Sequence, residues 1–214
     1  MNCANCKKLV CLVGGRRKPQ NCPSEHYPEV YEKARELYKI SENFEMARCA
    51  GIVEATGYIE WPRLKDTIEF AKLMKYQKLG IAFCVGLVEE ARKVHQILAD
   101  YGFEPHSVLC KTGSFTKTEV GNIPKEFQMT SKTGYTIGFV SCNPIAQALL
   151  LNEVKTDLNI IVGLCVGHDS LFIKYSDAPI TVLIAKDRRL GHNPAAALYT
   201  YYYNKFFHHD QQKK

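Results

Sequence analysis

The amino-acid sequence predicts an α/β fold with a predominantly parallel sheet of about five strands and helices on both faces. From residue 79 onward, short apolar runs alternate with amphipathic helices, the pattern of a parallel sheet covered on both faces. The first 24 residues differ, because they hold four cysteines and show no lasting helical or strand period. We therefore expect a cysteine-rich metal-binding knuckle over residues 1–24, followed by helices and a single α/β domain over residues 25–214.

Apolar periodicity places the elements in order along the chain. Before the sheet it predicts helices over residues 27–38, over residues 44–56 and after Pro62. The predicted strands are residues 79–83, 104–109, 137–141, 159–164 and 180–185. Further helices are expected over residues 87–101, 144–154 and 170–175, and in the aromatic C-terminal segment. The polar stretch 111–136 has no strong period, so we expect a lid or a connection across the sheet.

Composition excludes several classes of protein. The chain has 214 residues, of which 46% are hydrophobic and 23% charged, so disorder, collagen-like repeats and coiled coil are all excluded. No apolar run reaches the roughly 18 residues of a membrane span. The first residues place cysteines and lysines where a signal peptide has its apolar stretch. We therefore expect a cytoplasmic protein with no membrane partner.

Cysteine is over-represented, with nine residues in a chain that shows no export signal. Clustered cysteines in a reducing compartment are more often metal ligands or catalytic groups than disulfides. Four of them directly follow predicted strands: Cys84, Cys110, Cys142 and Cys165. They form two similar strand-Cys-helix-strand-Cys segments, which indicates a duplication within the domain.

The carboxyl ends of parallel strands meet at one edge of a sheet, where ligands bind. We therefore expect these four thiols to share one site that holds an iron–sulfur cluster, [4Fe–4S] in type, or a tetrahedral zinc ion. A cysteine at a strand end can also be a small buried hydrophobe, but four in equivalent positions favour a shared site.

The N-terminal set comprises Cys3, Cys6, Cys11 and Cys22. Its close spacing suits a metal site built from tight turns, and it fits zinc and an iron–sulfur centre equally well. Cys49, within a predicted helix, is assigned to the core. Five of the six excess positive charges lie at Lys7, Lys8, Arg16, Arg17 and Lys18. Because no aromatic residues or nucleic-acid motif accompany these charges, a solvated loop is favoured over a nucleic-acid partner.

Polar groups that could do proton or anion chemistry follow the predicted strands: Lys111, His168, Asp169, Lys186, Asp187, Arg188 and His192. His168 is a candidate general acid or base, an extra metal ligand, or a hydrogen-bond partner of a ligand. Asp169 is expected to cap the following helix or to orient His168. Residues 186–188 suit either an anion site or an ordinary surface turn with an ion pair. No P-loop, GxGxxG, GxSxG or HExxH motif is present.

Segments along nearly the whole chain carry a resemblance to a known family. They are CANCKKLVC with NCP, GIAFCVGLVEEA, LCKTGSFTK, SCNPIAQALLLN, VGLCVGHDSLFIKYSDAPIT and KDRRLGHNPAAALY. With these segments the chain resembles domain-of-unknown-function family 1847, known chiefly as uncharacterised predicted metal-binding proteins of bacteria and archaea. The resemblance implies metal binding by the two cysteine sets, and no particular reaction.

Three functional hypotheses follow. The first is an iron–sulfur protein whose sheet-edge site carries out reduction, dehydration or sulfur transfer on a small-molecule or anionic substrate. The alternative is a non-enzymatic zinc-binding module for metal sensing or interaction, in which substituting His168 and Lys186 would have almost no effect. The third is nucleic-acid binding through the basic N-terminal segment, which predicts an affinity that falls steeply with salt.

Overall fold

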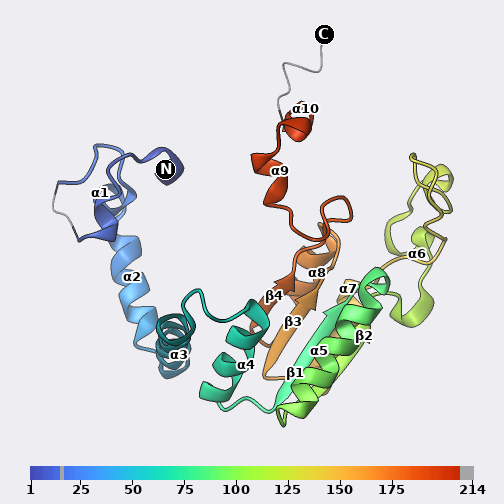
Figure 1. The fold of residues 1–214 in the computed structure, drawn as a ribbon, viewed down its shortest axis with the longest axis horizontal. Helices are drawn as coiled ribbons and strands as arrows, with labels where there is room; N and C mark the ends of the chain where they lie inside the picture. The colour runs from blue at the N-terminus through green and yellow to red at the C-terminus, as the bar shows by residue number, and fades with distance from the viewer. Residues whose placement is uncertain (15–16, 208–214) are drawn as a thin grey trace. The chain divides into compact units, whose positions relative to one another are not determined.

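A computed structural model describes residues 1–14 and 17–207 (Figure 1). The chain divides into two compact units, Met1–Thr56 and Gly57–Lys214. This division lies well after residue 24, so the expected boundary of a separate knuckle stays a prediction. Arg16 of the basic segment lies outside the described residues.

The first unit consists of short turns and helices. In order they are η1 (Cys3–Asn5), η2 (Val10–Leu12), α1 (Pro23–His26), α2 (Pro28–Tyr38) and α3 (Ser41–Gly57). Pro23 and Pro28 each occupy the first turn of a helix, where the missing N–H of proline costs nothing. Helices were expected over residues 27–38 and 44–56, and both are present. Cys49 of α3 is fully buried, as expected of a core residue.

The second unit is an α/β structure. Its first elements are α4 (Arg63–Leu73), β1 (Lys78–Phe83), η3 (Val85–Leu87), α5 (Val88–Asp100), β2 (Glu104–Leu109), η4 (Thr112–Ser114), α6 (Lys117–Gly121) and η5 (Lys125–Phe127). Then follow α7 (Pro144–Glu153), β3 (Leu158–Val162), α8 (His168–Tyr175), β4 (Ile180–Ile184), α9 (Ala196–Tyr199), η6 (Tyr201–Tyr203) and α10 (Asn204–Phe207). No helix in the described ranges is long and apolar enough to span a bilayer.

The sheet is parallel throughout, with the strand order β2-β1-β3-β4. Phe83, the last residue of β1, is paired with Leu109 of β2 and with Val162 of β3, so these three strands end level with one another. Right-handed crossovers place α5 on one face, in front of the sheet in Figure 1, and α7 and α8 on the other. The connections leave β1 and β3 toward opposite faces, the topology at which ligands of open α/β sheets bind beyond the carboxyl ends of the strands.

The α/β class with a parallel sheet is confirmed, but the strand expected over residues 137–141 is absent from the described structure. Gly138 has a φ of +71°, outside the strand region, and therefore interrupts the extended run. Ile137 and Phe139 are exposed, and Val140 forms only an isolated antiparallel bridge with Thr116. Four strands remain, and a long connection leads from β2 to α7.

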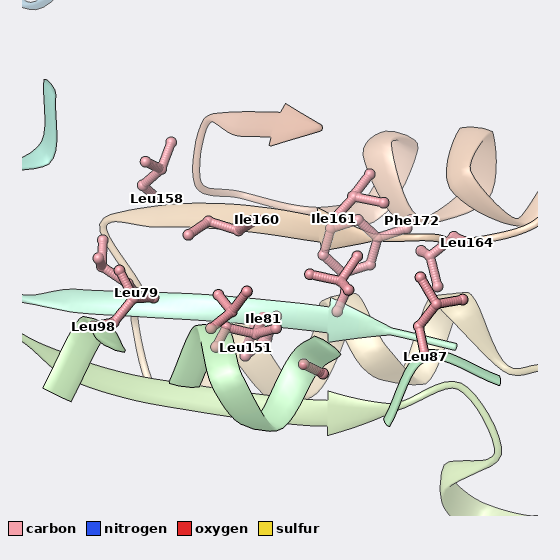
Figure 2. Close-up of a cluster of buried hydrophobic side chains, with 14 of the residues drawn as sticks. Leu79, Ile81, Leu87, Leu98, Leu151, Leu158, Ile160, Ile161, Leu164 and Phe172 are labelled. Carbon is pink, nitrogen blue, oxygen red and sulfur yellow. The ribbon is translucent and has the colours of Figure 1, made fainter. Parts of the chain in front are cut away.

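The core lies between the sheet and its helices. Fully buried side chains come from β1 (Leu79, Ile81), β3 (Ile160, Ile161), α5 (Leu98), α7 (Leu151) and α8 (Phe172). Figure 2 shows Leu87 and Leu164 together at the end of this core toward which β1 and β3 point. The apolar core therefore extends to the edge at which the cysteines emerge.

Candidate functional site at the carboxyl edge of the sheet

The structure brings together the four cysteines of the second unit. Cys84 and Cys110 directly follow β1 and β2, Cys165 follows β3 by a short turn, and Cys142 precedes α7. Their sulfurs form a continuous row of hydrogen-bond contacts, from Cys165 to Cys84 to Cys110 to Cys142, and the row ends on His168. Cys84 and Cys110 are buried, and the other two are half-buried.

Close packing holds the segments that carry Cys84 and Cys165 against each other. Leu87 of the turn after Cys84 is 1% exposed and packs against Gly163. A β-carbon on Gly163 would lie 2.8 Å from Leu87 Cδ2, and this glycine has a φ of +69°. Both facts require glycine, because a side chain would push the two turns apart.

Backbone hydrogen bonds bring Cys142 to the same place without a strand. The N–H of Asn143 donates to the carbonyl of Cys110 at 2.7 Å, and the N–H of Ser141 donates to Phe115 at 2.7 Å. The side chain of Asn143 then caps α7 by accepting from the N–H of Ala146 at 3.1 Å. Cys142 is therefore fixed by the helix cap that follows it.

Gln147 of α7 was not a candidate in the sequence, but it helps to hold the site. It is fully buried, and its Nε2 donates to the carbonyls of Phe83 at 3.2 Å and Val108 at 2.7 Å. These carbonyls lie just before Cys84 and Cys110. Gln147 Oε1 is buried without a hydrogen-bond partner among the described residues. The available signal was a polar residue at a buried position of a predicted helix.

Basic side chains surround the sulfurs. Lys186 is hydrogen-bonded to Cys84, and Arg188 Nη2 lies 3.2 Å from the sulfur of Cys165. Lys111 is close enough to Cys142 to lower the pKa of this thiol, and its Nζ donates to a carbonyl at 2.6 Å. The loop after β4 and the loop after β2 thus both present cations to the sulfur row.

The remaining candidates hold loops in shape. Asp169 Oδ1 accepts from the N–H groups of Gly167 and Ser170 at the start of α8, at 2.9 and 2.7 Å. Asp187 Oδ1 accepts from two backbone N–H groups of its own turn. His192 Nδ1 accepts from the N–H of Asp187 at 3.1 Å and thereby closes the loop over residues 187–192. Neither carboxylate forms an ion pair with a residue that the structure describes.

The hydrogen bonds set the charge on each sulfur. Contacts with Cys142 and Cys84 together with burial raise the pKa of Cys110, and the contact with Cys84 together with burial raises the pKa of Cys165. The pKa of Cys84 is well below its usual range, chiefly because of Cys110 and then Cys165. Cys110 and then His168 lower the pKa of Cys142 to about 4. The contact with Cys142 raises the pKa of His168, because a thiolate favours the charged imidazolium.

The N-terminal cysteines also lie together. Cys3, Cys6, Cys11 and Cys22 line one pocket of the first unit. Ser24 Oγ lies 3.0 Å from the sulfur of Cys22 and lowers the pKa of this thiol. The pocket walls include Lys7 and Lys8, which belong to the basic segment.

Comparison with known proteins places these residues in a family. A family model described as protein of unknown function DUF1847 matches residues 22–183. The chain belongs to the DUF1847 family. It is 45% identical over 205 residues to "Uncharacterized protein MJ0455" of Methanocaldococcus jannaschii. This alignment covers 96% of the present chain and 97% of the relative. No solved structure matches the chain.

The DUF1847 match covers the four sheet-edge cysteines and His168, and it ends before Lys186 and Arg188. Within the described part of this DUF1847 chain, no three His, Cys, Asp or Glu side chains gather around one point as a single metal ion requires. The cysteines are linked by pairwise contacts, of Cys84 with Cys110 and Cys165 and of Cys110 with Cys142.

Proposed function

We propose that this DUF1847 protein is a metalloprotein that holds an iron–sulfur cluster on Cys84, Cys110, Cys142 and Cys165. The observation that carries the proposal is the row of four sulfurs, which reach one edge of the sheet from four separate segments. Sulfur-only ligand sets select iron–sulfur clusters, zinc or copper(I) over metals that prefer oxygen. The donor set therefore fits the cluster chemically.

Two kinds of metal centre use four thiolates. Structural zinc requires four ligands around a single point. In a [4Fe–4S] cluster, each thiolate binds a different iron, so the four sulfurs occupy separate corners of a larger object. Both centres would use the same four contacting thiols, and the metal and sulfide analysis below distinguishes them.

The surrounding side chains favour metal ligation because thiols bind metals as thiolates. Cys84 and Cys142 already have lowered pKa values. Hydrogen bonds from Lys186 and Arg188 to ligand sulfurs stabilise negative charge there. When bound by all four thiolates, a cluster of this type would supply electron transfer for a reduction, whereas dehydration or sulfur transfer needs one iron without a cysteine ligand.

His168 is the side chain best placed to hold a proton at this site. Its Nδ1 is buried without a partner among the described atoms, so Nε2 makes the contact with Cys142. The contact with Cys142 raises the pKa of this ring. We assign it the role of proton donor beside the cluster, and Lys111 and Lys186 the role of holding negative charge.

The N-terminal pocket is a second metal site in this proposal. Its four thiols come from turns and the start of one short helix, as in compact zinc or iron–sulfur knuckles. The close spacing of these cysteines means that the site forms within the first unit alone.

The test is metal and acid-labile sulfide content, with an absorption spectrum, on full-length protein purified without oxygen. We compare the native chain with the double variant Cys84→Ser/Cys165→Ser. The expected native result is about four irons and as many sulfides assigned to the sheet edge, with broad visible absorbance that the double variant loses. Cys49→Ala is the matched control, because Cys49 is fully buried in α3 and belongs to neither set.

Two results would overturn the assignment. One is zinc alone, retained in full by the double variant, which would return the four cysteines to the core. The other is an absence of metal together with a reversible loss of free thiols on mild oxidation, because adjacent sulfurs would then act as a redox dithiol site.

A further inference from the structure

We propose that the sheet-edge site binds a small organic anion, whose carboxylate lies among Lys111, Lys186 and Arg188 and whose apolar part contacts exposed valines. The inference rests on the proposed function, because the anion would be the substrate or ligand of that same site. It adds the chemical class of the molecule.

The first observation is a group of cations without carboxylate partners. Among the described residues, no ion pair joins Lys111, Lys186 or Arg188 to an acid. Their hydrogen-bond acceptors are a backbone carbonyl for Lys111 and cysteine sulfurs for the other two. Elsewhere, lysines and arginines such as Arg92 do pair with glutamates of their own helix.

The second observation is that the nearby carboxylates face the backbone. Asp169 accepts from the N–H groups at the start of α8. Asp187, which lies between Lys186 and Arg188 in sequence, accepts from the N–H groups of Arg189 and Leu190 at 2.9 Å each. Both carboxylates therefore stabilise the backbone of their own loops. They do not neutralise the three cations, which can bind another anion.

The positive charge of the surrounding side chains exceeds the negative charge of a metal site on the four cysteines. Four thiolates with a cluster or a divalent ion carry about two negative charges in formal count. Lys111, Lys186 and Arg188 carry three positive charges. An excess of cations in a half-buried site favours an anionic ligand, and the guanidinium of Arg188 suits a carboxylate by two parallel hydrogen bonds.

The third observation is apolar surface beside this charge. Val85 follows Cys84 and is 49% exposed, and Val166 follows Cys165 and is 92% exposed. Because Cys84 and Cys165 are in contact, the two valines belong to neighbouring turns beyond the carboxyl ends of β1 and β3. A ligand with an apolar body beside its carboxylate would bury them, whereas an inorganic anion would not.

The test is calorimetric titration of full-length, anaerobically purified protein with butyrate, acetate and inorganic phosphate at constant ionic strength. We expect saturable binding of butyrate, with acetate weaker by roughly tenfold, because two methylene groups lose their burial. Arg188→Gln is expected to weaken butyrate binding by at least about tenfold. Arg189→Gln is the matched control, because this neighbouring arginine is hydrogen-bonded to Tyr203 and has no contact with the sulfurs.

Metal and sulfide are measured on the same samples, so that the two proposals fail separately. Absence of the cluster with butyrate binding intact would overturn the proposed function and support the anion site. If Arg188→Gln releases the cluster, the titration is repeated with Lys111→Gln in its place, because the hydrogen bond of Lys111 goes to a carbonyl. Equal loss in the Arg188 and Arg189 variants, phosphate binding tighter than butyrate, or no saturable binding of any probe would each overturn the organic-anion proposal.

Discussion

Nε2 of Gln147 donates a hydrogen bond of 2.7 Å to the carbonyl of Val108. A second bond from the same atom reaches Phe83 on the neighbouring strand. One helix side chain thus links the ends of β1 and β2, immediately before the residues that lead to Cys84 and Cys110. This link adds to the backbone pairing of β1 with β2, in which the N–H of Cys110 also donates to the carbonyl of Phe83 at 2.9 Å.

Replacing Gln147 with leucine is expected to lower the free energy of unfolding by about 1–2 kcal/mol. The substitution removes both hydrogen bonds, although Phe83 keeps the N–H of Cys110 as a second partner at 2.9 Å. Urea unfolding monitored by circular dichroism measures the change. Gln96→Leu on the exposed face of α5 is the control and should change stability by less than about 0.5 kcal/mol. Equal effects of the two variants would contradict the linking role of Gln147.

A Gly163→Ala variant is expected to be destabilised by about 2 kcal/mol or more. The new methyl group combines an unfavourable φ of +69° with a contact of 2.8 Å to Leu87. Gly134→Ala separates these causes, because Gly134 has a φ of +86° with no atom within 4 Å of the added carbon. That control should lose only about 1 kcal/mol by the same unfolding assay. A loss at Gly163 no larger than at Gly134 would show that the Leu87 contact is unimportant.

Much of the site could be predicted because parallel strands impose its geometry. Cys84 and Cys110 directly follow apolar runs, and the register that pairs Phe83 with Leu109 makes those runs end together. The expected strand over residues 137–141 was wrong, because the positive φ of Gly138 is a conformational choice that apolar alternation does not reveal. Cys142 nevertheless reaches the edge of the sheet, since the N–H of Asn143 binds to the strand end beside it.

The contacts of Arg188 and Gln147 could not be derived from local sequence. The residue triplet at 186–188 suited a surface ion pair equally well, and only the folded chain shows Asp187 bound to backbone N–H groups instead. Gln147 lies 39 residues from Val108 in sequence, so its role depends on how α7 packs against the sheet. The apolar periodicity of a sequence does not predict which distant residues its polar side chains will contact.

The Cys142–His168 pair predicts a distinctive pH dependence in metal-free protein. The pKa of Cys142 falls from 9.0 to about 4, so its contribution to the free energy of unfolding is complete above pH 9 and is lost as the pH falls toward 4. Alkylation of Cys142 by iodoacetamide should therefore persist at pH 6. His168→Gln should shift the midpoint of alkylation to higher pH, because the imidazolium partner is gone. Per-residue mass spectrometry measures both rates, and an unchanged midpoint would refute the pairing.

The two cysteine sets are expected to lose metal independently. Cys3→Ser/Cys6→Ser changes only the pocket of the first unit, whereas Cys84→Ser/Cys165→Ser changes only the sheet edge of the second. Each double variant should retain the metal of the other set, because each site takes all its ligands from one unit. The combined variant should lose as much metal as the two double variants lose together, because changes at sites without shared partners are additive. Elemental analysis of all four proteins tests this, and loss of all metal in either double variant would show instead that the two sets form one centre.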